Sequence, residues 1–279
     1  MEHSSREIGQ AIAQARAQRS ITDGSTCTER GHPIAIWIAM CRTLRKAVLA
    51  ASLLALPLSP LWAQKIYFDM AHGEAPWPPQ MEALAKRVGY QIEAGNGPAA
   101  AEALAGSRLI YLRAPNRAFQ DSEKQAIISF VKAGGSLLLV LDEEERQKLA
   151  VVGVNDVIAP FGLKLSGDTP RIVNTGAVAR AGEIHKADRE IPYDGGRQVL
   201  GGTPFAYQLD REGKPAQPSA AYVKLDNGAR IVVMGEGMAS LFLGVPEGVR
   251  LTIEPANPKW WGKDSLIFME EVLTWLLAR

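Results

Sequence analysis

The chain has 279 residues, of which 47% are hydrophobic and 22% are charged, so it can form a globular core and disorder throughout is excluded. Its 31 basic and 30 acidic residues leave a formal net charge of +1, which excludes the concentrated cationic surface that nucleic-acid binding requires.

The first 39 residues lie ahead of a signal-like segment, do not resemble part of a secreted fold, and are polar from residue 20 through His32. Among them, residues 7–19 favour a short helix rich in Ala, Gln and Arg, with little apolar face. We expect translation to begin at Met40, so that residues 1–39 reflect a misassigned start. A cytoplasmic regulatory extension is the alternative.

Residues 40–63 have the three parts of a secretory signal peptide. A basic segment (40–46) precedes an apolar run (47–58), and a small residue, Ala63, stands before the expected cleavage site. The apolar run of about a dozen residues is shorter than the roughly 20 that span a membrane. We therefore expect cleavage after Ala63, no membrane span in the mature chain, and a periplasmic or secreted location. A buried core helix is the alternative.

The mature chain, residues 64–279, is expected to be one domain without thiol chemistry. Both cysteines, Cys27 and Cys41, precede the cleavage site. The mature chain can then form no disulfide in an oxidising compartment, so its core alone must stabilise the fold.

The first half of the mature chain is expected to alternate strands and helices. Short apolar runs bounded by turn residues predict the strands, and apolar residues at helical spacing predict the helices. The run 136–141 is apolar throughout, as in strands of a parallel sheet that helices cover on both faces. The expected elements are strand 65–69, helix 79–88, strand 90–94, helix 99–104, strand 108–112, a helix capped by Asp121 or Ser122 and ended by Gly134, and strand 136–141.

The second half is expected to be richer in strands. Its elements are a helical stretch at 151–161, a Gly- and Pro-rich excursion at 164–217 with β-like pieces at 171–173 and 205–207, a hairpin of 221–225 and 229–234 around Asp226-Asn227-Gly228, and a helix at 264–277. These patterns predict an α/β fold: a flavodoxin-like three-layer sandwich with a mostly parallel sheet and a β-rich C-terminal excursion.

Four stretches of the mature chain carry a family resemblance by their order and spacing: 67–74, 114–123 with 130–139, 159–163, and 228–235. Together they resemble the class I glutamine-amidotransferase-like superfamily. Within it they are similar to uncharacterised secreted or membrane-linked (DUF4350/GIFT-like) domains, akin to those of gliding-motility ABC-transporter accessory proteins and of the intraflagellar-transport GIFT domain. The resemblance spans nearly the whole mature chain.

The resemblance implies binding rather than catalysis. Active amidotransferases place a cysteine nucleophile on a tight turn after a sheet strand. Here the turn after strand 136–141 reads Asp142-Glu143-Glu144-Glu145, and no Gly-x-Ser-x-Gly motif supplies a serine instead. Related domains without the cysteine are thought to bind, so no catalytic residue and no cofactor are expected.

Candidate site residues follow the strands, because ligands of open α/β sheets lie beyond the carboxyl ends of the strands. These side chains could bind a cation, a sugar or a peptide. Alternatively they only bond the loop backbone and begin a helix. Since His72 and Glu74 belong to no larger metal-ligand pattern, no specific metal is expected. The candidates are Asp69, His72 and Glu74 after the first strand, Arg113 and Asn116 after the third, Asp142 and Glu143 after the fourth, and Glu236 after the hairpin.

We therefore expect a non-catalytic periplasmic binding domain, an accessory to envelope or transport machinery. Its partner would be an envelope protein or a small ligand. The enzyme alternative is a hydrolase acting on a glycan or a similar envelope substrate through paired carboxylates such as Asp69 and Asp142. The separation of the two carboxylates decides that chemistry.

Overall fold

The structure is a computed structural model that describes residues 64–73, 79–170, 176–193, 195–237, 239 and 263–278. The predicted signal peptide, the segment ahead of it, Glu74 and the expected strand 171–173 lie outside the described residues. Among the helices within these ranges, none is long and apolar enough to cross a membrane.

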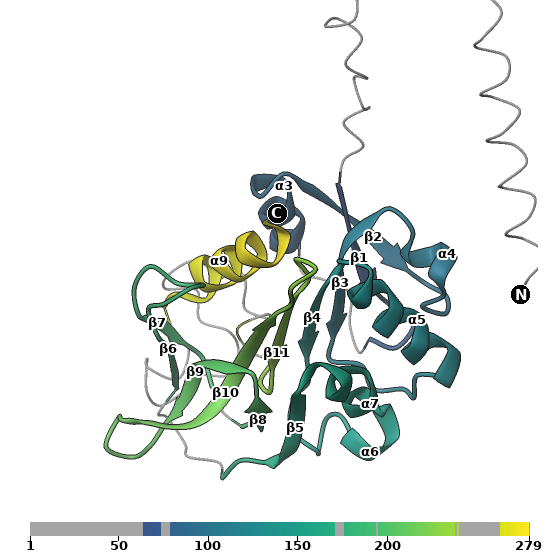
Figure 1. The fold of residues 1–279 in the computed structure, drawn as a ribbon. Coiled ribbons are helices and arrows are strands. Elements are labelled where there is room, and N and C mark those ends of the chain that lie inside the picture. Colours follow the sequence, from purple (N-terminus) through teal and green to yellow (C-terminus); the bar gives the residue numbers. More distant parts are fainter. Residues whose placement is uncertain are drawn as a thin grey trace, which may run out of the picture. The chain divides into compact units, whose positions relative to one another are not determined.

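The first half of residues 64–279 alternates strands and helices, as its periodicity predicts (Figure 1). Every expected element is present, with bounds that differ by at most two residues. The elements are β1 (Gln64–Asp69), α3 (Pro79–Arg87), β2 (Tyr90–Gly95), α4 (Ala101–Leu104), β3 (Ser107–Arg113), α5 (Asp121–Lys132) and β4 (Ser136–Val140).

The second half contains short helices and then mainly strands. The helical stretch expected at 151–161 is broken at Gly153, whose φ of 69° ends one helix and begins the next. The elements are α6 (Leu149–Val152), α7 (Val154–Ile158), η1 (Ala159–Phe161), β5 (Leu163–Asp168), β6 (Ala177–Ala179), β7 (Arg189–Ile191), β8 (Arg197–Gly201), β9 (Thr203–Leu209), β10 (Pro215–Lys224), β11 (Arg230–Met234) and α9 (Ser265–Leu277).

Nine strands form one mixed sheet in the order β2-β1-β3-β4-β11-β10-β9-β6-β7, and β5 pairs with β8 in a separate two-stranded sheet. The pairs from β2 to β11 are parallel, whereas those from β11 to β7 are antiparallel. The expectation of a mostly parallel sheet is therefore wrong for its second half. A short turn such as 226–228 can join only antiparallel neighbours, whereas parallel neighbours need a longer crossover.

Helices cover both faces of the parallel half of the sheet (Figure 1). Alternate residues of β4 belong to two different buried clusters. Leu138 and Val140 share one with α3 and α9, and Leu137 and Leu139 share the other with α5 and α7. Burial on both faces confirms what the uniformly apolar sequence of β4 predicts.

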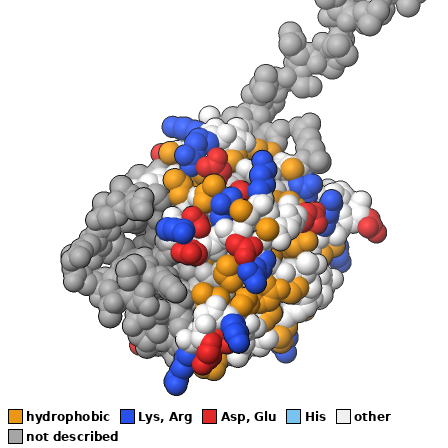
Figure 2. Space-filling view, turned by 90° about the vertical axis from the view of Figure 1, so that its left-hand side faces the viewer, with side chains coloured by type: hydrophobic (Ala, Val, Ile, Leu, Met, Phe, Trp, Pro, Cys, Tyr) orange, Lys and Arg blue, Asp and Glu red, His pale blue; other side chains and the backbone are white. Residues whose placement is uncertain are grey.

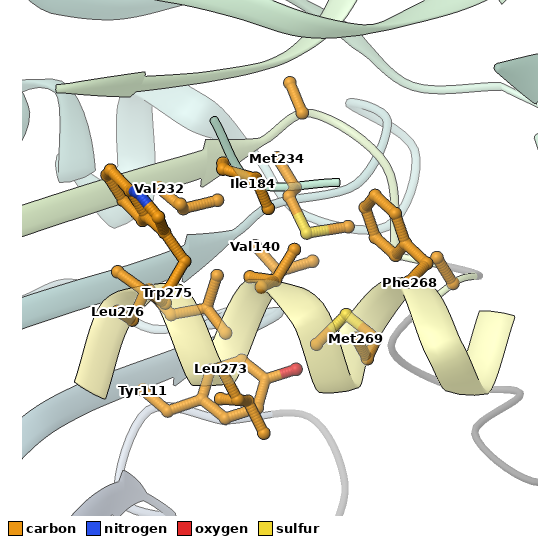
Figure 3. Packing of buried hydrophobic residues seen from close by; sticks show 14 of the residues in the cluster. Tyr111, Val140, Ile184, Val232, Met234, Phe268, Met269, Leu273, Trp275 and Leu276 are labelled. Carbon is orange, nitrogen blue, oxygen red and sulfur yellow. The ribbon is translucent and has the colours of Figure 1, made fainter. Parts of the chain in front are cut away.

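Helix α9 packs on one face of the sheet through its apolar side chains (Figure 3). Met269, Val272, Leu273 and Leu276 are buried against β3, β4 and β11. Side chains from four strands donate hydrogen bonds to the last carbonyls of the helix and hold its end on the sheet. These bonds run from Arg230 to Trp275, from Ser136 to Leu276, from Tyr90 to Leu277, and from Arg108 to Ala278.

The surface carries charges of both signs. Figure 2 shows one face, on which Lys and Arg side chains are interspersed with Asp, Glu and apolar ones. Among the coloured residues of this face no large patch of one sign stands out, in keeping with the net charge of +1. This face therefore lacks the concentrated positive charge that attracts a polyanion.

Candidate functional site

The predicted site residues that the structure describes, all but Glu74, lie at the carboxyl ends of β1, β3, β4 and β11. These ends meet at one edge of the sheet because the strands are parallel. Their contacts form two clusters. The histidine cluster comprises Asp69, His72 and Glu123. The arginine cluster comprises Arg197 and the loop 142–147 that it bonds.

In the histidine cluster, His72 lies between two carboxylates. Its Nδ1 is 3.2 Å from both carboxylate oxygens of Asp69, and its Nε2 is 3.4 Å from Oε2 of Glu123. The ring also stacks on Phe119, with ring centroids 4.1 Å apart. Only 9% of the His72 side chain is exposed and Asp69 is fully buried, so the ring fastens the loop after β1 to the start of α5.

Glu123 was not among the predicted site residues, although its sequence context marks it. Gln120 and Glu123 form a capping box, in which the backbone N–H of Gln120 donates to Oε2 of Glu123 at 2.8 Å. The N-cap of α5 is therefore Gln120, and the expectation of Asp121 or Ser122 is wrong. The other oxygen, Oε1, accepts the N–H of Ala99 at 3.0 Å. One buried carboxylate thus connects the segment before α4 to the start of α5.

The carboxylates favour the charged form of the histidine. Burial lowers the pKa of His72, but the hydrogen bonds and charges of Asp69 and Glu123 outweigh it, so this pKa lies above its ordinary value. Burial, together with the charges of Asp69, Glu123 and Glu93, raises the pKa of Tyr67 to about 12. The cluster therefore favours an imidazolium beside a neutral phenol.

The loop after β3 lies across the histidine cluster. Arg113, the last residue of β3, is buried. The backbone N–H of Asn116 donates to the carbonyl of His72 at 2.7 Å, and Pro115 forms an isolated bridge with Gly73. Asn116 is thus close to His72, as the strand-end argument predicts, but the contact is made by its backbone.

Replacing Ala114 with glycine is expected to stabilise the fold by about 0.5–1 kcal/mol. Ala114 has a φ of 46°, a left-handed conformation that costs a residue with a Cβ about 1–2 kcal/mol. Its N–H donates to the carbonyl of Val140 at 2.9 Å, which helps to hold it there. Glycine adopts this conformation without the clash, although its greater freedom in the unfolded chain cancels part of the gain.

Urea unfolding of the full chain measures this effect, with Ala114→Val as the matched control. The bulkier Cβ of valine is expected to lower the free energy of unfolding, because a β-branched residue fits this conformation worst. Equal stabilities for the glycine, alanine and valine forms would contradict a strained backbone at residue 114.

In the arginine cluster, Arg197 at the start of β8 organises the acidic loop after β4. Only 1% of its side chain is exposed. Its Nε donates to the carbonyl of Asp142 at 2.7 Å, and its Nη2 donates to the carbonyl of Gln147 at 2.6 Å. Nη2 also donates to Oε2 of Glu144 at 2.7 Å. One guanidinium thus bonds the beginning, middle and end of the loop. Sequence reasoning missed Arg197, because no local motif surrounds it.

The acidic run 142–145 makes internal bonds as well. Oδ1 of Asp142 accepts the N–H of Glu143 at 2.8 Å, and the N–H of Asp142 donates to Oε1 of Gln147 at 2.8 Å. Nε of Arg146 lies 3.5 Å from Oε1 of Glu143. The side chains of Asp142 and Glu143 are mostly buried. These contacts bond the acidic run to the scaffold. The run is not a solvated helix start, because Asp142 and Glu143 are mostly buried and the next helix, α6, begins only at Leu149.

Glu236 follows β11 and is buried. Here the backbone just after β11 approaches the backbone at the start of β8. The N–H of Arg197 donates to the carbonyl of Gly235 at 2.6 Å, and a side chain at residue 235 would collide with the carbonyl of Arg197. Burial and the charge of Glu236 raise the pKa of Tyr193, which keeps its hydroxyl protonated. Within the described ranges, no three His, Cys, Asp or Glu side chains are grouped to hold a metal ion.

No family model and no curated protein sequence matches the chain. Among solved structures, the mmIFT52 N-terminal domain is similar over 77% of this chain and 98% of its own, with a TM-score of 0.56 at 14% identity. Two glutamine-amidotransferase-like structures also align. A putative GMP synthase protein from Thermoplasma acidophilum matches over 76% of this chain and 94% of its own (TM-score 0.45, 12% identity). PurLQS from Thermotoga maritima matches over 77% and 99% (TM-score 0.44, 9% identity).

At such identities, the likeness to the mmIFT52 N-terminal domain concerns the fold alone. The narrower DUF4350 assignment has no matching family model.

Proposed function

We propose that this chain is an exported binding domain without catalytic activity, an accessory to envelope or transport machinery. The observation that carries this proposal is the bonding at the carboxyl ends of the strands. His72 and the loop 142–147 are bonded to buried parts of the scaffold, which leaves these groups poorly placed to take part in turnover. The binding partner is an envelope protein or a small ligand.

The loop after β4 supports the absence of catalysis. In the superfamily that the sequence resembles, active members carry a cysteine nucleophile on such a turn. Here Asp142 follows the strand, and Arg197 bonds its carbonyl. Residues 64–279 contain no cysteine that could act from elsewhere in the mature chain.

The hydrolase alternative gains little support from this geometry. A carboxylate acting as nucleophile or general base must reach the substrate. Asp69 is fully buried, with its oxygens directed at the ring of His72. Oδ1 of Asp142 accepts the backbone N–H of the next residue. Both carboxylates therefore resemble structural groups more than catalytic ones.

The finer fold relationship is part of the same proposal. Helices on both faces of the parallel strands support a flavodoxin-like three-layer sandwich, to which β10, β9, β6 and β7 add an antiparallel extension. The likeness to the mmIFT52 N-terminal domain supports placing the chain near the DUF4350/GIFT-like domains.

One experiment addresses both export and turnover. We expect the full chain, expressed with a C-terminal tag in a Gram-negative host, to be recovered from the periplasm with Gln64 as its first residue. The purified protein is expected to release neither ammonia from glutamine nor chromophore from a panel of aryl glycosides. Asp69→Asn and Asp142→Asn serve as matched controls, with circular dichroism to check that each is folded.

Two results would contradict the proposal. A protein that stays in the cytoplasm, or whose first residue precedes Met40, would contradict export. Hydrolysis by the wild type that disappears in a folded Asp69→Asn or Asp142→Asn variant would contradict a purely binding role and favour the carboxylate hydrolase.

A further inference from the structure

His185 is a second buried histidine, in the segment between β6 and β7. Its side chain has no exposed surface. The ring stacks on Phe268 of α9 at a centroid distance of 4.9 Å and lies 5.5 Å from the ring of Phe205 on β9. Nδ1 is 2.8 Å from Oε2 of Glu271 on α9. The segment 181–188 is thus attached to α9 through this ring.

The second ring nitrogen of His185, Nε2, makes no hydrogen bond to the described residues. This nitrogen is buried. In the neutral ring, Nδ1–H donates to the carboxylate of Glu271 and Nε2 is a bare acceptor. Protonation would place an N–H on Nε2 among aromatic rings, where an unsatisfied donor is costly.

The charges around His185 offset the effect of its burial only in part. The charged groups that face the ring are Glu271 on α9 and Arg189 on β7. Arg189 already donates to both oxygens of Glu271, at 2.9 and 2.7 Å. A protonated His185 would therefore add a second cation to a carboxylate that is already neutralised. Burial lowers the pKa of His185 and outweighs the hydrogen bond and charge of Glu271.

His72 provides the internal contrast. Its ring lies between the two carboxylates of Asp69 and Glu123, so one added proton relieves the repulsion between two anions. His185 lies beside a carboxylate that an arginine has already balanced. Within the described residues, the surroundings of the two buried histidines therefore shift their pKa values in opposite directions, up for His72 and down for His185.

The segment 181–188 also forms one wall of a groove of about 770 Å³ along α9. Ile184 is buried in the core on the sheet side of the helix (Figure 3), and Glu183 accepts a hydrogen bond from Nε1 of Trp275 at 3.2 Å. The residues that line the groove are Glu183, Ile184, Lys186, Arg230, Lys263, Leu266, Ile267, Glu270, Glu271, Thr274, Trp275 and Ala278.

We propose that residues 181–188 form an acid-released latch: protonation of His185 detaches this segment from α9 and opens the wall of the groove. The inference rests on the packing of His185 and is independent of the proposed binding function. Because the pKa of His185 is lower in the closed state than in the open one, the latch is held fully above about pH 6.5. It is released progressively as the pH falls below that value.

Amide hydrogen exchange of the full chain, corrected for the intrinsic effect of pH, tests the latch. Between about pH 7.5 and about pH 5 we expect the protection of residues 181–188 to fall, with the change confined to the range below about pH 6.5. Only there does the opening constant rise, by at most about tenfold for each pH unit. Helix α5, on the other face of the sheet, serves as the internal reference and is expected to keep its protection.

Two variants identify the responsible group. His185→Asn keeps an N–H near Glu271 but cannot titrate. His185→Phe keeps the aromatic ring stacking. In both variants the protection of residues 181–188 is expected not to change with pH. His72→Asn, the matched control, is expected to keep the pH dependence. The proposal is overturned by wild-type protection that does not change with pH, or by variants at residue 185 that change as much as the wild type.

An NMR titration of the wild type decides the question if neither variant folds. A ring of His185 that titrates at or above about pH 6.5 while residues 181–188 remain protected would overturn the latch. A ring that titrates only together with loss of protection would support it.

Discussion

Replacing Arg197 with methionine is expected to lower the free energy of unfolding by about 3–5 kcal/mol, the cost of breaking a buried charged network. Its guanidinium donates to the carbonyls of Asp142 and Gln147 and to the carboxylate of Glu144. Methionine has a similar length and no donor, so these carbonyls would remain without their hydrogen bonds. The loop 142–147 is expected to lose its conformation first.

Urea unfolding monitored by circular dichroism measures this loss. The matched control is Arg87→Met, because Arg87 also contacts a glutamate, Glu270, at 3.0 Å but is about half exposed. That control is expected to cost less than about 1 kcal/mol, as exposed ion pairs do. If the two variants were equally stable, Arg197 would not be the group that holds the loop.

Replacing Glu123 with alanine is expected to destabilise the fold by about 2–4 kcal/mol. This carboxylate accepts the N–H groups of Gln120 and Ala99 and contacts Nε2 of His72. The variant would lose the capping box of α5 and leave a buried N–H at Ala99 without an acceptor. Loss of one of its two carboxylates should also lower the pKa of His72, which NMR can follow in the same protein.

The matched control for this prediction is Glu82→Ala, since Glu82 also lies in the first turn of a helix, α3, but is exposed. Its removal is expected to change the stability by at most about 0.5 kcal/mol. A Glu123→Ala protein as stable as this control, with an unchanged pKa of His72, would show that the histidine cluster does not stabilise the fold.

The sequence by itself determined the elements of the first half of residues 64–279, the turn 226–228 and helix α9, because their signals are local, whereas β5, β6, β7 and β8 were not individually predicted. The uniformly apolar run of β4, the turn 226–228 and the apolar stripe of α9 each depend on neighbouring residues, and each is found where the pattern predicts. The strand-end argument also placed Asp69, Asp142 and Glu236 correctly, because parallel strands end at one edge of the sheet. Export stays a prediction, since its signal lies outside the described residues.

Only the tertiary structure decided which of these side chains form the scaffold. Arg197 bonds a loop that is 50 to 55 residues away in sequence, and Glu271 contacts His185 across 86 residues. No local pattern encodes such pairs, because the chain must fold before the partners meet. Sequence reasoning selected His72 for its place after the first strand, but no local pattern indicated how the pKa of His72 or of His185 would shift. Folding places His72 between two carboxylates, which outweigh its burial and raise its pKa. It buries the ring of His185 completely beside a single carboxylate that Arg189 also bonds, and there burial dominates and lowers the pKa.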